Sequence, residues 1–432
     1  MIPLMRLFFD VTRTLVHSRK HTPTGIDRVE HAYIRYLLRQ SDQSDVWFIA
    51  NTPFGRGAMP PSEMREIFEK IELRQVATAE LGASSMFGEL VEVLARPVAL
   101  TRIAPLALRG IASREKDSKA TVARAFLRGA RRFDRLFRDS KRTVYLHTSH
   151  LQLDDPRCFR WLSRPHLFPV FFVHDLIPIE FPEFCSPGSQ RRHIARIETV
   201  LQYAQAVIVN SEFTRNSLNT YATTSRVPPL KVVPLANTIR DFKQAQESEF
   251  VPSGPFFLHV GTIEGRKNIG HLINVWRHIV TKMGAENAPR LVIVGRRGWE
   301  CENVTSVLDR SRELANHLIE VSNINDLELR SLMLRANGLI SVSMTEGYGL
   351  PPVEALSLGL PVIASDIPAH REILGDACEY VSLHDGDALA RKIIESCVGM
   401  RLRSRRVGLP LFDWDQHVER ALAFVQSTLE KS

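Results

Sequence analysis

The 432-residue chain has few cysteines and lacks a long apolar run. These two features argue against a disulfide-rich or zinc-binding protein and against a membrane-spanning one. Its five cysteines are scattered and form no Cys-x-x-Cys pair, so we expect neither a disulfide framework nor a zinc site. No stretch reaches the ~18 uninterrupted apolar residues typical of a transmembrane helix. The first ten residues also lack the basic start and long apolar core of a signal peptide, and they are more typical of a first strand. We therefore expect a cytoplasmic protein.

Two common ligand-binding motifs are also missing. No Gly-x-Gly-x-x-Gly follows a strand pattern, which argues against a nicotinamide dehydrogenase. Metal-dependent sugar transfer would need an Asp-x-Asp pair after a strand. Asp413 and Asp415 have that spacing, but they lead into a helical pattern near the C-terminus, where capping is the expected role. We expect no metal and no cofactor.

Composition and periodicity predict an α/β protein with two domains. The chain is 44% hydrophobic and 24% charged, and it is long enough for two separate cores. Short apolar runs alternate with helical patterns twice over, which predicts two Rossmann-like domains with mostly parallel sheets. Strands are expected in the first half at 4–11, 46–50, 143–147, 168–174, 206–210 and 231–235. Strands are expected in the second half at 256–260, 291–295, 318–321, 338–344 and 361–365.

A break in the apolar pattern at 238–255, with mixed charge and turn-forming residues, marks the expected linker and hinge. We therefore place an N-terminal domain at 1–245 and a C-terminal domain at 246–410. The last segment, 411–432, is predicted to be a separate amphipathic helix.

Positive charge is concentrated in 101–142, which holds 13 Lys and Arg against 4 Asp and Glu. Arginines recur there at helical spacing, with phenylalanines on another side of the same helix. One interpretation is a helix in an anionic membrane surface, with its phenylalanines in the headgroup region. The other is a helix whose phenylalanines pack on the first domain and whose arginines are solvated. The concentrated charge favours the membrane, and nucleic acid is not expected because no base-stacking platform accompanies the charge.

Two glutamates, Glu346 and Glu354, enclose a segment where the expected strand at 338–344 runs into a helix. Gly347 and Gly349 allow a tight turn and close backbone approach, and the two prolines that follow suit a first helical turn. Unpaired amides and the helix dipole at such an end favour a pyrophosphate, while the glutamates can accept hydrogen bonds from sugar hydroxyls. The segment predicts a sugar-diphosphate site, and an ordinary turn is the alternative.

A glycine-bearing loop at Gly261 and Thr262 follows the strand at 256–260, and Arg266 and Lys267 come just before the next helix. Arginine can bind phosphate oxygens bidentately and lysine adds a compact charge. The pair is therefore suited to neutralise a departing nucleoside diphosphate. Two solvated cations at a helix edge are the alternative.

The first domain offers two further candidates. His174 and Asp175 end an expected strand at its carboxyl edge, where ligands bind in open α/β sheets. Asp175 either orients the histidine ring or caps the next turn. Gly25 lies in the loop that opens a helix, and Arg28 on its first turn is placed to reach a phosphate.

Residues 346–354 resemble the Glu-x7-Glu signature of family 4 glycosyltransferases, and the loops just described resemble others of that family in order and spacing. Thr262 stands where the family often has arginine, so Arg266 and Lys267 are the expected cation pair. The resemblance implies the GT-B fold, with two Rossmann-like domains facing across a cleft and a C-terminal helix that crosses back to the first domain. It also implies metal-independent transfer with retention of configuration.

The family pattern implies roles for individual residues. The catalytic set that it implies is His174, Arg266, Lys267 and Glu346. The donor-binding set that it implies is Gly25, Gly261, Thr262, Gly347, Tyr348, Gly349, Leu350 and Glu354. Contact with the acceptor or with a phosphate is implied for Arg28 and Asp175.

The resemblance is to bacterial polysaccharide transferases, which implies a hexosyltransferase that moves mannose or a related hexose or deoxyhexose from a GDP-sugar. A lipid-linked or oligosaccharide acceptor in O-antigen, capsule or exopolysaccharide synthesis fits the basic segment. A peripheral position on the cytoplasmic face of the inner membrane also fits the basic segment. Two alternatives stay open: a non-transferring GT-B enzyme such as a nucleotide-sugar epimerase or phosphorylase, and a catalytically silent sugar-nucleotide-binding membrane subunit.

Overall fold

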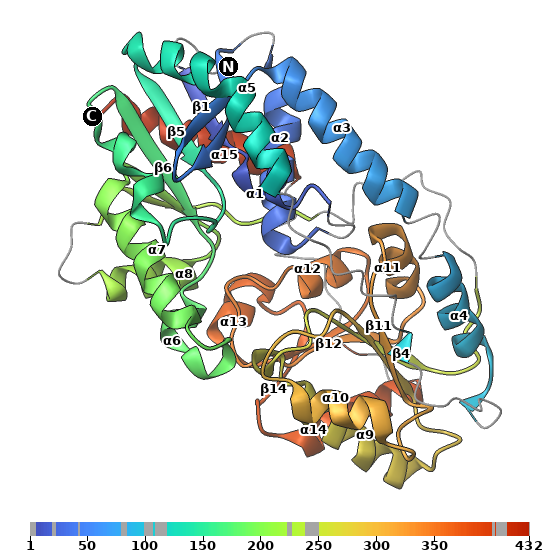
Figure 1. The fold of residues 1–432 in the computed structure, drawn as a ribbon. Coiled ribbons are helices and arrows are strands. Elements are labelled where there is room, and N and C mark those ends of the chain that lie inside the picture. Colours follow the sequence, from blue (N-terminus) through green and yellow to red (C-terminus); the bar gives the residue numbers. More distant parts are fainter. Residues whose placement is uncertain are drawn as a thin grey trace.

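The chain folds into two α/β domains, each built on a seven-stranded sheet (Figure 1). This computed structural model describes residues 6–19, 23–41, 44–78, 84–98, 107–108, 119–222, 227–237, 250–399, 402 and 413–431. Most of the expected linker, 238–249, lies outside the described residues, as do parts of the basic segment.

The first sheet has the order β3-β2-β1-β5-β6-β7-β8, and all of its neighbours are parallel except β2 and β3. Its strands are β1 (Arg6–Asp10), β2 (Val46–Thr52), β3 (Gly55–Met59), β5 (Thr143–His147), β6 (Leu167–Val173), β7 (Ala206–Val209) and β8 (Leu230–Val232). β1, β5, β6 and β7 are buried throughout, as expected for strands covered on both faces. The six predicted strands are confirmed. β3 was missed because its sequence, Gly-Arg-Gly-Ala-Met, carries no strand pattern.

The second sheet is parallel throughout, in the order β14-β13-β12-β9-β10-β11-β4. Its strands are β9 (Phe256–Val260), β10 (Arg290–Val294), β11 (Leu318–Val321), β12 (Gly338–Ser341), β13 (Val362–Ser365), β14 (Glu379–Val381) and β4 (Ala107–Leu108). The five predicted strands are confirmed. β14 and β4 were missed because two or three residues are too few to show a period.

Helices cover both sheets. In the first domain they are α1 (Thr12–Val16), α2 (Gly25–Arg39), α3 (Pro61–Thr78), α5 (Lys119–Arg138), α6 (Ile177–Glu180), α7 (Ser189–Tyr203) and α8 (Glu212–Tyr221). In the second they are α9 (Ile269–Met283), α10 (Glu302–Arg310), α11 (Asp326–Met333), α12 (Leu350–Ser357), α13 (Pro368–Leu374) and α14 (Gly386–Cys397). Two more helices pack on a domain other than that of their neighbours in sequence. These are α4 (Ser84–Ala95), which packs on the second domain, and α15 (Trp414–Leu429), which packs on the first.

Side-chain caps set the start of the helices that matter for the site. Thr24 accepts a hydrogen bond from the backbone N–H of Asp27, whose carboxylate accepts one from the Thr24 N–H, so α2 begins with a capping box. Asn325 and Glu328 form the same arrangement at α11. Asp413 caps α15 through the Gln416 N–H, which confirms the capping role expected of the Asp-x-Asp spelling.

Residues 84–98 and β4 depart from the predicted N-terminal domain, because they pack on the second domain. The Leu94 carbonyl accepts a hydrogen bond from the Ser253 N–H (2.9 Å), and Phe87 lies against Phe250 with 6.4 Å between ring centroids. β4 pairs with β11 at the edge of the second sheet. The sequence pattern does not predict this packing, because it depends on the open edge of the second sheet at β11, which lies far along the chain.

The basic helix α5 packs on the first domain through its phenylalanines. Phe133 is 5% exposed and lies 5.7 Å from Phe8 and 5.3 Å from Trp161, ring centroid to ring centroid. Glycines allow the close approach to β3, since a Cβ on Gly129 would meet the Ala58 nitrogen at 2.6 Å. The interpretation that placed these phenylalanines in the headgroup region of a membrane is therefore wrong. The arginines on the opposite face of α5 are exposed: Arg124, Arg128, Arg131, Arg135 and Arg138.

The C-terminal helix α15 returns to the first domain, as the resemblance implied, and contacts α2 and β7 (Figure 1). His417 on its first turn is fully buried. Its Nδ1 donates to the Pro234 carbonyl (2.8 Å), because a carbonyl only accepts, and its Nε2 faces the Tyr33 hydroxyl at 3.3 Å. Among the helices that the structure describes, none has the length and apolar content needed to cross a bilayer.

The buried His417 gives a pH test of the α15 contact. Burial lowers the pKa of His417 to about 4, although the Pro234 carbonyl opposes the shift. Its neutral form therefore stabilises the fold above the unfolded pKa of about 6.5, and this stabilisation is lost as pH falls toward 4. In His417→Gln we expect the free energy of unfolding to fall less steeply between pH 7 and pH 5, by about 1–2 kcal/mol, as measured by urea denaturation. Equal slopes for the variant and the parent protein would contradict this role.

Candidate functional site

Two loops of the second domain meet because their strands are neighbours. β9 pairs with β12, and chain order reverses at β9, which lies between β12 and β10. Ligands in open α/β sheets bind outside the carboxyl ends of the strands at such a reversal. The loop after β9 carries Arg266 and Lys267, and the loop after β12 carries Glu346.

Glu346 is the centre of a buried ion cluster. One carboxylate oxygen accepts from Lys267 Nζ (2.5 Å) and Ser343 Oγ (2.7 Å), and the other accepts from Arg266 Nη1 (2.7 Å). Arg266 Nε also reaches Glu264 at 2.6 Å. Glu346 is 6% exposed and Lys267 is 7% exposed. The structure thus brings together three of the four residues that the resemblance implied for catalysis.

Electrostatics keep this cluster charged. Burial alone would raise the pKa of Glu346, but Arg266 and Lys267 hold it well below its usual range. Burial lowers the pKa of Lys267, and Glu346 opposes that shift. The two cations are therefore held in place against two carboxylates, and further negative charge brought beside them would compete with Glu346 and Glu264.

The turn after Glu346 brings backbone to the start of α12. Gly349 has φ 88°, a left-handed conformation that favours glycine, and it precedes α12 without a side-chain cap. The first N–H groups of an uncapped helix can bind an anion. Gly347 packs against the first domain, where a Cβ would lie 2.6 Å from the His174 carbonyl oxygen.

Other expected donor residues also fall around these turns. Leu350 is the first residue of α12, and a Cβ on Gly25 would lie 3.7 Å from Leu350 Cδ1. Gly261 has φ 150° and lies under the Lys267 side chain, and Thr262 follows it in the same loop. The Tyr348 side chain points elsewhere, since its hydroxyl donates to the Leu235 carbonyl (2.8 Å).

Glu354 lies on α12 and accepts a hydrogen bond from a residue of the first domain. Arg28 Nη1 donates to Glu354 Oε1 (2.9 Å), and the Arg28 guanidinium also pairs with Asp326 at the start of α11. Glu354 is 1% exposed, and burial raises its pKa although Arg28 opposes the shift. The sequence did not reveal Asp326 as a partner, because it comes close only through the tertiary fold.

His174 lies at the carboxyl end of β6 and is neutral at physiological pH. Burial lowers its pKa to about 4. Its Nε2 donates to the Thr148 carbonyl (2.8 Å), so Nδ1 carries the lone pair. Its own carbonyl accepts from Asn210 Nδ2 (2.9 Å). Asp175 does not orient this ring. Its carboxylate accepts from the Ile177 N–H (3.1 Å) and caps the turn, the second of the two roles expected for it.

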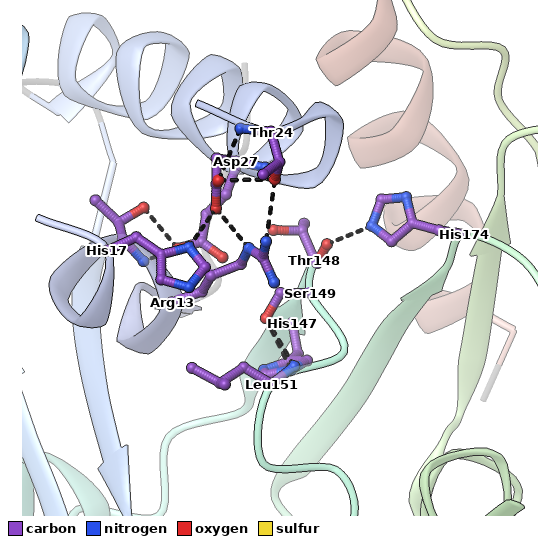
Figure 2. Close-up of polar contacts among 11 residues, drawn as sticks. Arg13, His17, Thr24, Asp27, His147, Thr148, Ser149, Leu151 and His174 are labelled. Carbon is purple, nitrogen blue, oxygen red and sulfur yellow. Dashed lines mark hydrogen bonds and ion pairs between the residues drawn. The ribbon is translucent and has the colours of Figure 1, made fainter. Parts of the chain in front are cut away.

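Figure 2 shows a polar cluster near His174 that the sequence analysis missed. The buried Asp27 accepts from Arg13 Nε (2.6 Å) and contacts His17 Nδ1 (2.7 Å), and Arg13 Nη2 donates to Thr24 Oγ1 (3.1 Å). Burial would raise the pKa of Asp27, but His17 and Arg13 hold it well below its usual range. The sequence offered a signal only for Thr148, whose carbonyl accepts from His174. It follows the predicted strand 143–147 at its carboxyl end, the same kind of position that identified His174.

The domains touch directly beside this site. Ser211 Oγ donates to the Gly347 carbonyl (2.8 Å). The Glu372 carboxylate accepts from the backbone N–H groups of Glu212 and Phe213 at 2.6 and 2.8 Å, at the start of α8. Residues from both domains therefore surround the turns after β6 and β12.

Residues 241–403 match the family model described as glycosyl transferases group 1. Over these residues the chain is similar to the group 1 glycosyltransferases. The match covers the second domain, including the loops that hold Arg266, Lys267, Glu346 and Glu354.

Two curated proteins of Escherichia coli are similar to this chain. The serotype-specific mannosyltransferase WbdA is 28% identical over 243 residues, which is 53% of this chain and 29% of WbdA. The O-antigen chain mannosyltransferase B is 27% identical over 245 residues, which is 52% of this chain and 60% of that protein. The chain thus aligns with only part of the length of these relatives. Its resemblance to bacterial polysaccharide mannosyltransferases is confirmed.

The solved structures show the fold. Anabaena HepE in complex with UDP-glucose has a TM-score of 0.57 and 14% sequence identity, and the alignment covers 99% of this chain and 100% of HepE. The fold is therefore GT-B, as the resemblance implied.

The ion cluster predicts a large stability effect at Glu346. Glu346→Gln leaves Lys267 charged and buried without a carboxylate partner at 2.5 Å, and breaking one side of a buried pair costs about 3–5 kcal/mol. We expect a destabilisation of this order in chemical denaturation. The matched control is Asp366→Asn, which breaks the exposed pair with Arg371 and should cost less than about 1 kcal/mol. Similar effects for both variants would contradict a buried, charged cluster.

Proposed function

We propose that the protein is a retaining, metal-independent hexosyltransferase. It moves mannose or a related hexose or deoxyhexose from a GDP-sugar to a lipid-linked or oligosaccharide acceptor in surface polysaccharide synthesis. The observation that carries the proposal is the cluster of Arg266 and Lys267 on Glu346, beside the uncapped start of α12. The similarity to O-antigen mannosyltransferases supports the choice of sugar and pathway.

In this proposal the donor lies along the second domain. Glu354 holds the ribose hydroxyls, and the backbone amides at Gly349 and Leu350 bind the pyrophosphate. Glu346 accepts hydrogen bonds from sugar hydroxyls, and the two cations next to it turn toward the diphosphate. Bidentate Arg266 and compact Lys267 then stabilise negative charge that grows on the leaving group.

The transfer step breaks the bond between the anomeric carbon and the donor phosphate oxygen, and the electron pair leaves with the diphosphate. The acceptor hydroxyl forms the new bond to the anomeric carbon from the same face, and its proton passes to a phosphate oxygen. His174 offers the sugar a neutral ring with an available Nδ1 lone pair. This role suits hydrogen bonding to a sugar hydroxyl better than charge stabilisation.

The place of action in the proposal is the cytoplasmic face of the inner membrane. Five exposed arginines on α5 give the first domain a basic surface, and each contributes about 1 kcal/mol near an anionic membrane. The attraction is electrostatic, because the phenylalanines of α5 pack against the first domain.

A donor panel tests the proposal. GDP-, UDP-, dTDP- and ADP-sugars are added to the protein without metal, and thermal unfolding is followed. A ligand at 100 times its dissociation constant stabilises by about 2.7 kcal/mol, so a GDP-sugar should raise the melting temperature clearly. The shift should disappear in Glu354→Ala.

Incubation of the stabilising donor with membrane extract should then yield a product that retains the donor's anomeric configuration. Turnover of the donor without any acceptor would support an epimerase or a phosphorylase instead. Binding without turnover in any mixture would support a sugar-nucleotide-binding subunit.

A further inference from the structure

The carboxylate that we assign to the donor ribose is already occupied by a residue of the other domain. Arg28, on the first turn of α2, donates from Nη1 to Glu354 Oε1 at 2.9 Å. Its side chain is 15% exposed and that of Glu354 is 2% exposed, so the contact is largely shielded from solvent. Gly25 and Leu350 bring the starts of α2 and α12 close together beside it.

The contact is stronger than a surface ion pair. Burial would lower the pKa of Arg28, but Asp326 and Glu354 raise it above its ordinary value, so the guanidinium stays charged. Charge-assisted hydrogen bonds in such surroundings are about twice as strong as neutral ones. A ribose hydroxyl offers Glu354 only a neutral donor, so it competes with a better one.

Asp326 offers Arg28 a second partner. It pairs with the same guanidinium from the start of α11, and its side chain is 21% exposed. If Glu354 turns to a ribose, Arg28 keeps a carboxylate and its charge is not stranded in a buried site. The arrangement therefore has two states in which Arg28 keeps a carboxylate partner, one with Arg28 shared between Glu354 and Asp326 and one with Arg28 on Asp326 alone.

We propose that Arg28 is an interdomain latch that holds Glu354 in the donor-free protein and passes to Asp326 when the nucleotide ribose binds. This inference rests on the proposed function, since it takes Glu354 as the ribose ligand. Donor binding then weakens one contact between the domains, while the contacts of Gly347 with Ser211 and of Glu372 with the start of α8 persist. Arg28 is a positioning residue in this scheme, because it acts through Glu354.

Calorimetric titration with GDP, with UDP as a second probe, tests the latch. Arg28→Gln removes the competing charge, so GDP should bind at least about fivefold more tightly than to the parent protein. Arg28→Lys keeps a charge but loses the planar fork that spans two carboxylates, so its affinity should lie between the two. Thermal unfolding of each variant establishes that it is folded.

The matched control is Glu372→Ala, which breaks an interdomain contact that does not involve Glu354. Its GDP affinity should equal that of the parent protein. Equal tightening in Glu372→Ala and Arg28→Gln would overturn the latch in favour of a general effect of domain opening. Weaker or unchanged binding in Arg28→Gln would also overturn it, and weaker binding would make Arg28 a direct donor contact. If neither GDP nor UDP binds to any folded variant, the proposed function fails together with the latch.

Discussion

The buried charges around Glu346 are the interaction on which the site depends. Two cations and two carboxylates lie together where β9 and β12 end, and their removal from water is compensated by their contacts with one another and with Ser343. These contacts tie the two loops into one unit. The position of the glycine turn and the start of α12 follows from that connection, because both come directly after Glu346 in the chain.

The same turn joins the two domains. Gly347 fits against the His174 carbonyl only because it has no Cβ, and its own carbonyl accepts from Ser211. The loop that carries Glu346 is therefore held on one side by ions of the second domain and on the other by the backbone of the first. A movement of one domain relative to the other would change the contacts of this turn, which lies next to the residues proposed to hold the donor.

Most of the fold and several site residues could be predicted from the sequence. The buried strands of the two sheets are short apolar runs with a clear pattern, and each predicted strand is present. Arg266, Lys267 and Glu346 were identified from their places after strands, and the structure brings them together. β3, β4 and β14 were missed because glycine-rich or very short strands depend on their neighbours for pairing.

The amino-acid sequence by itself determined the strand and helix pattern, the order of the loops at the sheet edges and the residue types needed for a sugar-diphosphate site. These properties are local, since they depend on periodicity, caps and turn residues within a few positions. The tertiary structure alone decided that the phenylalanines of α5 face β3 and Trp161, that residues 84–98 and β4 pack on the second domain, and that Arg28 meets Glu354 and Asp326. Each of these contacts joins residues far apart in the chain, and their partners become available only when both sheets have formed.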